Sequence, residues 1–143
     1  MPRKNLRAII YWALGTYWVG LFILTSIPGR SLPSVRISDK LVHFGAFFLL
    51  AGLFLIAARI QGRFLFLSRR PVVCALVIIL LYAALDEWHQ KFIPGRDGSI
   101  GDWTADLIGT VTCVFFAYFS FRKWVRENQP RKQEGGKAAG RFK

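Results

Sequence analysis

Four long apolar runs divide the chain, and polar segments separate them. The runs cover residues 8–27, 41–58, 71–85 and 107–121, and within them only His43 can carry a charge near neutral pH. Long apolar stretches almost free of charge are typical of membrane-spanning helices rather than of a soluble core. The pattern therefore predicts an all-α fold, an integral membrane four-helix bundle.

The third and fourth runs are too short to cross a bilayer by themselves. Each contains 15 residues, which rise about 22 Å in a helix, whereas the hydrocarbon core is about 30 Å thick. We therefore expect the third helix to continue through Asp86 to about Gln90, and the fourth to begin near Asp102 or Trp103, with Asp102 as its cap. This extension would carry charges to the edge of the lipid, where ionisable groups are costly and usually functional.

Basic residues are distributed unequally between the two sides of the predicted bundle. Fifteen of the 20 Lys and Arg residues precede the first run, separate the second from the third, or follow Phe121. The two remaining loops hold the other five, together with six of the eight acidic residues. The positive-inside rule then places both termini in the cytoplasm and the acidic loops outside.

The net charge of +12 could also indicate nucleic-acid binding. The basic residues lie in short clusters at the ends of apolar runs, however, and match no nucleic-acid-binding fold, so we expect no nucleic-acid partner. We place the transmembrane domain at residues 1–125 and a basic, disordered cytoplasmic tail at 126–143, which is rich in charge and glycine. Cys74 and Cys113 lie inside apolar runs and are interpreted as buried structural thiols.

Polar residues gather at the predicted outer ends of three helices. Within each helix they are spaced by four positions, which puts them on one face, and a bundle brings such faces to a common level. We expect His89 at the surface and Asp97 in a turn. The candidate catalytic residues are His43, Asp39, Asp86 and Glu87, and the candidate substrate-binding residues are Arg96, Gln90, Lys40, Asp102 and Asp106.

These residue types are compatible with three kinds of site. Carboxylate oxygens and one imidazole could hold a divalent cation such as magnesium, manganese or zinc, and the sequence leaves its identity open. Alternatively, His43 could act as a general acid or base, oriented by Asp39, Asp86 or Asp106, while Arg96 binds a phosphate or carboxylate. In the third interpretation, a salt-bridged network only holds the helices together.

The motifs at these helix ends resemble those of the VanZ-like family. They are Asp39-Lys40-x-x-His43-Phe44, then Asp86-Glu87-x-x-Gln90-x-Phe92-x-Pro94-Gly95-Arg96, and then Asp102; Ser26-x-Pro28 is similar to the opening signature of the family. The resemblance covers about Leu6 to Phe121. It implies a small multi-pass helical protein of the bacterial cytoplasmic membrane. The founding member of the family is associated with resistance to the glycopeptide teicoplanin.

Asp106 departs from the family pattern, which commonly has asparagine at this position, three residues before a glycine that is Gly109 here. The change keeps the shape of the side chain and adds a charge that could strengthen a cation site. Residues and resemblance together predict an outward-facing polar site that acts on lipid-linked or cell-envelope substrates, with membrane lipids as partners and a link to teicoplanin-type resistance. The alternative is a non-catalytic module that binds a lipid headgroup or amphiphile, or supports a partner complex.

Overall fold

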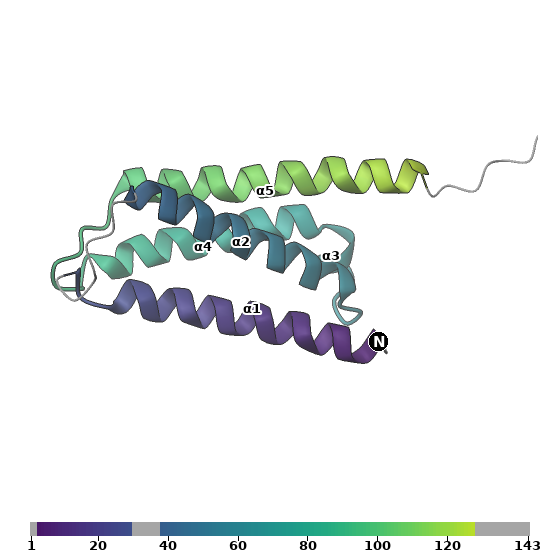
Figure 1. Ribbon diagram of the computed structural model, residues 1–143, viewed down its shortest axis with the longest axis horizontal. Coiled ribbons are helices and arrows are strands. Elements are labelled where there is room, and N and C mark those ends of the chain that lie inside the picture. Colours follow the sequence, from purple (N-terminus) through teal and green to yellow (C-terminus); the bar gives the residue numbers. More distant parts are fainter. Residues whose placement is uncertain (1–2, 30–37, 128–143) are drawn as a thin grey trace, which may run out of the picture.

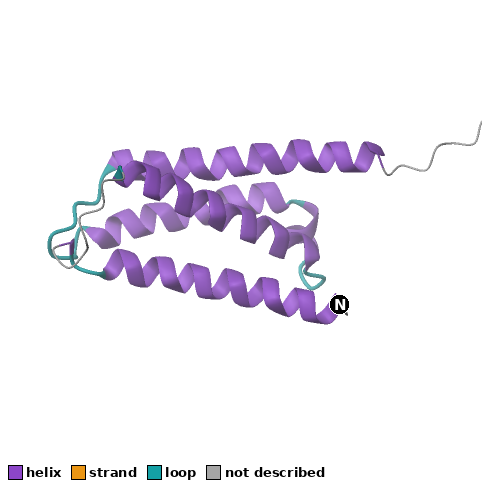
Figure 2. Cartoon of the chain, viewed as in Figure 1, coloured by secondary structure: helices purple, strands orange, loops and turns teal. Residues whose placement is uncertain are grey.

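The computed structural model describes residues 3–29 and 38–127, and over these residues the chain is helical without any strand (Figures 1 and 2). This confirms the predicted all-α class. Four helices are long: α1 (Arg3–Ser26), α2 (Asp39–Ile60), α4 (Pro71–Gln90) and α5 (Ile100–Glu127). A short fifth helix, α3 (Leu65–Arg69), which the sequence pattern did not predict, lies between α2 and α4.

The four long helices are each long and apolar enough to cross a membrane, α5 over its first 21 residues to Ser120. Helix α4 ends at Gln90, as bilayer thickness required. Helix α5 runs on to Glu127, and the rest of the expected tail lies outside the described residues.

Helix α5 begins at Ile100, before the expected start, because Ser99 and not Asp102 caps it. The backbone N–H of Asp102 donates to the Ser99 hydroxyl oxygen over 3.0 Å, and that hydroxyl donates to Asp102 Oδ2 over 2.7 Å. The expectation that Asp102 is the cap is therefore wrong. Asp102 occupies the third position of the helix instead, and its carboxylate accepts from the Ser99 hydroxyl, whereas the Ser99 backbone N–H donates to Glu87 on α4.

Helices α2 and α4 form the middle of the bundle, with α1 and α5 on opposite sides of it (Figure 1). Helix α2 packs against every other helix, whereas α1 and α5 do not contact each other over the described residues. The start of α1 and the end of α5 lie at one end of the bundle, and the end of α1, the start of α2 and the α4–α5 connection lie at the other (Figure 1). Residues far apart in the sequence therefore meet at the second end.

Small side chains bring the middle helices together. Ala51 on α2 and Ala75 and Ala83 on α4 are fully buried around Leu50 and Ile79. Inside a bilayer, helices associate through close packing because lipid supplies no hydrophobic driving force, and small residues permit that packing. The core thus fixes the positions of α2 and α4 along the whole bundle.

A glycine sets the close approach of α2 and α5. A Cβ atom at Gly109 would collide with the backbone carbonyl of Phe44, so the two backbones meet there directly. Phe44 follows His43, and Gly109 lies one turn beyond Asp106. The same contact therefore fixes the register in which His43 faces Asp106.

The connection between α4 and α5 is anchored to the end of α1. Gly95 has a φ of 73°, a left-handed conformation that glycine adopts without strain. The N–H of Gly29 donates to the Pro94 carbonyl over 3.1 Å, and a side chain at Gly29 would collide with Gly95. The turn and the C-terminus of α1 therefore form one packed unit at this end of the bundle.

We predict that Gly109→Ala destabilises the protein by about 1–3 kcal/mol, because the added methyl group meets backbone that can only move by separating α2 from α5. Thermal unfolding in detergent measures the change. Gly45→Ala in α2 is the matched control, since its Cβ would meet nothing within 4 Å. Equal effects of the two substitutions would contradict the close approach.

Candidate functional site

The candidate site lies where the start of α2, the end of α4 and the start of α5 come together, at the end of the bundle that carries the α4–α5 connection (Figure 1). Seven polar or charged residues are buried among the described residues, and six of them are candidates from the sequence: His43, Asp86, Glu87, Gln90, Asp102 and Asp106, with Thr110 as the seventh. They come from α2, α4 and α5. The structure thus brings the three predicted motifs together in one buried centre, which we call the polar centre.

A hydrogen bond between His43 and Asp106 lies in the middle of the polar centre. His43 Nδ1 is 3.0 Å from Asp106 Oδ1, and the two residues are only 8% and 0% exposed. Glu87 Oε1 lies 3.8 Å from the same nitrogen. Of the three carboxylates expected as partners of His43, the structure therefore pairs Asp106 with it directly and adds Glu87 as a second neighbour.

The two carboxylates of α4 are held by different parts of the chain. Asp86 accepts from the Thr25 hydroxyl of α1 over 2.7 Å and from Gln90 Nε2 over 3.0 Å. Glu87 lies about 100° around the helix from Asp86 and accepts from the backbone N–H of Ser99 over 2.7 Å. Asp86 therefore ties α4 to α1, while Glu87 faces α2 and α5.

The outer rim of the polar centre carries the exposed candidates. Lys40 pairs with Asp102 over 3.1 Å, although the Lys40 side chain is 63% exposed. Asp39 is also exposed and has a carboxylate oxygen within 4.8 Å of ligand atoms of His43 and Asp102. Exposed ion pairs contribute little to the stability of a fold. Asp39 and Lys40 therefore line the solvent-facing edge of the polar centre and add little to its stability.

Arg96 lies against the end of α1. Its Nη2 donates to the Leu24 carbonyl over 2.9 Å and its Nε to the Ile27 carbonyl over 3.2 Å. A cation there satisfies carbonyls that the helix leaves unpaired and interacts favourably with the helix dipole. The structure shows no ion pair between Arg96 and a carboxylate of the described residues, and anion binding by Arg96 stays a prediction.

His89 packs against α1 and is only partly exposed, rather than lying freely at the surface. Its ring stacks on Phe22 with centroids 5.1 Å apart, and its Nε2 lies 3.1 Å from the Ser26 hydroxyl. Asp97 is exposed in the α4–α5 connection, but it lies after the turns at residues 91–92 and 94–95 and not in one of them, so the expected turn position is wrong. His89 therefore joins the contacts that attach α1 and stands apart from the His43 pair.

Acidic groups outnumber basic groups in the polar centre. Four carboxylates are buried there, whereas Lys40 is exposed and His43 is the one buried group that can become a cation among the described residues. Buried charges are costly unless they are paired. The centre is therefore suited to hydrogen-bond donors, protons and cations, and an additional anion would be repelled.

Two groups of residues could hold a metal ion. The buried group is His43, Glu87 and Asp106, and the outer group is Asp39, His43 and Asp102; within each, the ligand atoms lie within 4.8 Å of one another. One imidazole with two carboxylates suits manganese, zinc or magnesium. A cation in the buried group would replace the hydrogen bond between His43 and Asp106.

Four buried side-chain polar atoms have no hydrogen-bond partner among the described residues. They are Asp106 Oδ2, Thr110 Oγ1, Trp103 Nε1 and Tyr82 Oη. Trp103, Asp106 and Thr110 recur at intervals of three and four, so they share one face of α5. Unpaired buried polar atoms are rare, and this face retains hydrogen-bonding capacity for a ligand.

Thr25, Ser99 and Thr110 belong to the polar centre, although the sequence analysis did not select them for it. Ser99 stands three residues before Asp102, which is the spacing of a capping box, so a signal for it was present. Thr110 lies four residues after Asp106 and shares its face. Thr25 lies in an apolar run, and only the packing of α1 on α4 reveals its bond to Asp86.

Comparison with known families identifies one that fits both the helices and the site. The family model described as VanZ/LLP1 matches residues 5–122. No curated protein and no solved structure matches the chain. The matched segment contains all four candidate membrane spans and every residue of the polar centre. The chain therefore belongs to the VanZ/LLP1 family of membrane proteins.

Proposed function

We propose that this protein is a membrane-embedded enzyme that acts on a lipid-linked or cell-envelope substrate, with His43 as the group that transfers a proton. The observation that carries the proposal is the buried 3.0 Å hydrogen bond between His43 Nδ1 and Asp106 Oδ1. Such a bond orients an imidazole and selects its tautomer. A bundle that needed only an apolar core would gain nothing from burying this pair.

Asp106 acts as the positioning residue in this mechanism. Its carboxylate accepts the Nδ1 proton of His43 and leaves the lone pair of Nε2 available. No described residue donates to Nε2. The nitrogen can take a proton from a hydroxyl group, an amine or a water as it attacks, and can return that proton to the leaving group. Because Asp106 is fully buried, the low polarity of its surroundings strengthens the hydrogen bond that holds the imidazole ring of His43.

The excess of carboxylates limits the substrate class. A reacting group that is itself anionic would be repelled by Asp86, Glu87 and Asp102, so the reacting group is neutral or cationic, such as a sugar hydroxyl or an amine. The site lies at one end of the spans, where the polar head of a lipid-borne molecule resides. Teicoplanin carries an acyl tail, so it could insert into the lipid surface where this site lies. An enzyme that acts on lipid-linked envelope molecules at that surface would account for the resistance that the family name implies.

We further propose that the protein resides in the bacterial cytoplasmic membrane with the polar centre on the outer side and both termini in the cytoplasm. The two described ends of the chain lie opposite the polar centre (Figure 1). Arg59 lies in the last turn of α2 at that same end, and Arg63, Arg69 and Arg70 follow it in the α2–α4 connection, which contains no acidic residue. Basic loops remain in the cytoplasm, which supports this orientation.

A second candidate function, a non-catalytic module that binds a headgroup or supports a partner complex, is favoured by the contacts of the carboxylates. Asp86, Glu87 and Asp106 each bond to a group from another element of the fold. A network of this kind can lock helices together without any chemistry. Turnover of a substrate separates the two candidates.

The catalytic proposal predicts that His43→Gln lowers turnover about 10²–10⁴-fold, which is the usual contribution of a positioned acid or base. Purified protein in detergent would be offered neutral and amine-bearing polyprenyl-linked glycans and phospholipids, and products measured by mass spectrometry. Asp97→Asn is the control, since Asp97 is exposed and lies outside the polar centre. Turnover that survives His43→Gln unchanged contradicts the role of His43, and ligand-dependent stabilisation without turnover supports the binding module.

The orientation predicts which side of the membrane a cysteine probe reacts from. With Cys74 and Cys113, both buried, replaced by alanine, Asp97→Cys should react with a membrane-impermeant maleimide on intact cells. Gly62→Cys, which is exposed at the other end, should react only after permeabilisation. The reverse pattern would place the polar centre on the cytoplasmic side.

A further inference from the structure

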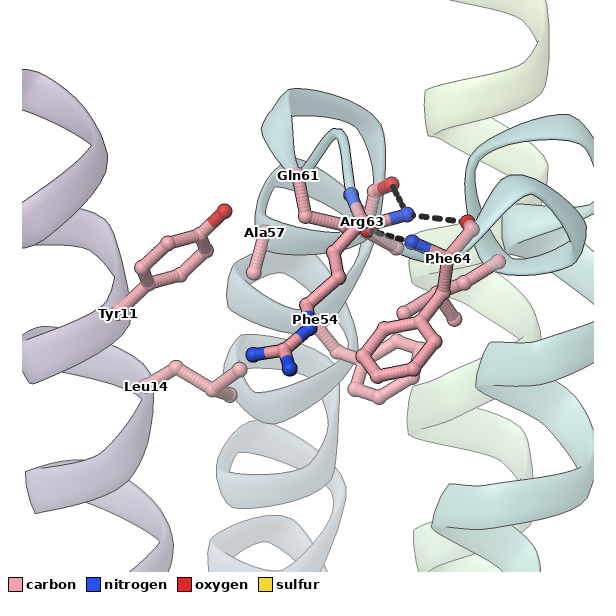
Figure 3. A pocket seen from close by; sticks show the side chains of 9 residues that line it. Tyr11, Leu14, Phe54, Ala57, Gln61, Arg63 and Phe64 are labelled. Carbon is pink, nitrogen blue, oxygen red and sulfur yellow. Dashed lines mark hydrogen bonds between the residues drawn. The ribbon is translucent and has the colours of Figure 1, made fainter. Parts of the chain in front are cut away.

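A pocket of about 330 Å³ opens at the end of the bundle opposite the polar centre (Figure 3). It lies between α1, the last turns of α2 and the segment that leads into α3. Leu14 on α1, Phe54, Ala57 and Ala58 on α2, and Leu67 on α3 form most of its wall. The wall is almost entirely apolar, and a cavity without polar partners takes hydrocarbon rather than water.

The small side chains of α2 create this pocket. Ala57 and Ala58 line the pocket where larger residues would fill the space, and Tyr11 and Leu14 lie on α1 across from Ala57 (Figure 3). Both alanines are buried, so the hollow reaches the backbone of α2. A single alkyl chain of a neighbouring lipid matches such a narrow apolar slot between two helices.

Gln61 fixes the rim of the pocket. Its Nε2 donates to the Phe64 carbonyl over 2.7 Å, and its Oε1 accepts the N–H groups of Arg63 and Phe64 over 2.9 and 2.8 Å. These three bonds hold the turn after α2 in one conformation. Arg63 and Phe64 are thereby presented at the opening of the pocket (Figure 3).

The Arg63 side chain extends from this turn back along α2 (Figure 3), and Arg63 lines the same pocket as Leu14 and Phe54. Its Cζ is 6.0 Å from the centroid of the Phe64 ring, and no described carboxylate pairs with it. Residues 59–70 contain four arginines and no acid. Arg63 is exposed just beyond the end of α2, at the rim of an apolar pocket, and a phosphate there would satisfy its planar array of donors.

We propose that this pocket binds one anionic phospholipid of the adjacent leaflet, with an acyl chain between α1 and α2 and the headgroup phosphate on Arg63. Basic pockets between membrane helices on the cytoplasmic side recognise anionic headgroups in this way. The occupant is a lipid and not a peptide, because the wall offers hydrocarbon contact and one cation but no row of backbone donors. The proposal is independent of the chemistry at His43, which lies at the other end of the bundle.

The test is lipid binding by the full-length protein, measured by native mass spectrometry from detergent with phosphatidylglycerol and phosphatidylcholine offered in equal amounts. We expect phosphatidylglycerol to be retained in preference to phosphatidylcholine. Arg63→Gln should weaken phosphatidylglycerol binding about fivefold, the effect of one arginine near a headgroup. Arg69→Gln is the matched control, since Arg69 is also basic and exposed at this end but does not line the pocket, and it should leave the preference intact.

Ala57→Leu tests the acyl slot separately from the charge. The larger side chain occupies the space beside Ala58 and should reduce the binding of both lipids, while thermal unfolding shows whether the variant is folded. Equal binding of the two lipids by the unaltered protein would overturn the proposal. Equal losses in Arg63→Gln and Arg69→Gln would also overturn it, because the attraction would then be diffuse and not a site.

Discussion

The structure depends on pairing the acidic groups that short apolar runs bring to the edge of the membrane. An unpaired carboxylate at that depth would cost more than most single contacts in the bundle contribute. The bond between His43 and Asp106 satisfies this constraint between α2 and α5, and the bond between Thr25 and Asp86 satisfies it between α1 and α4. Every long helix therefore has one end fixed by a buried or partly buried polar contact in the same region.

The same contacts explain why the candidate site can be both structural and reactive. Small core residues and the Gly109 contact fix the distance between helices, so the imidazole of His43 is held rigidly without a flexible loop. Rigid placement of a proton-transfer group is what catalysis requires. At the opposite end of the bundle, an apolar pocket and Arg63 form the site that we propose for a phospholipid. In these two proposals, one end of the bundle carries the chemistry and the other binds a lipid.

Much of this arrangement could be predicted from the sequence because bilayer thickness is a strict constraint. It required α4 to continue to Gln90, and it brought the three motifs to one level. The partner of His43 could not be predicted, since the choice among three carboxylates depends on the rotation of α5 about its axis and on the close contact at Gly109. The contacts of Arg96 could not be predicted from the sequence either, because they depend on the left-handed turn at Gly95, which directs the Arg96 side chain to the carbonyls of α1.

A double-mutant cycle on His43 and Asp106 tests the central claim most directly. The free energy of unfolding in detergent would be measured for His43→Gln, Asp106→Asn, the double variant and the unaltered protein. A bonded buried pair predicts a coupling free energy of about 1–3 kcal/mol, because removing either partner already removes most of the interaction. Strictly additive effects would contradict the account, since His43 and Asp106 would then contribute to the bundle independently.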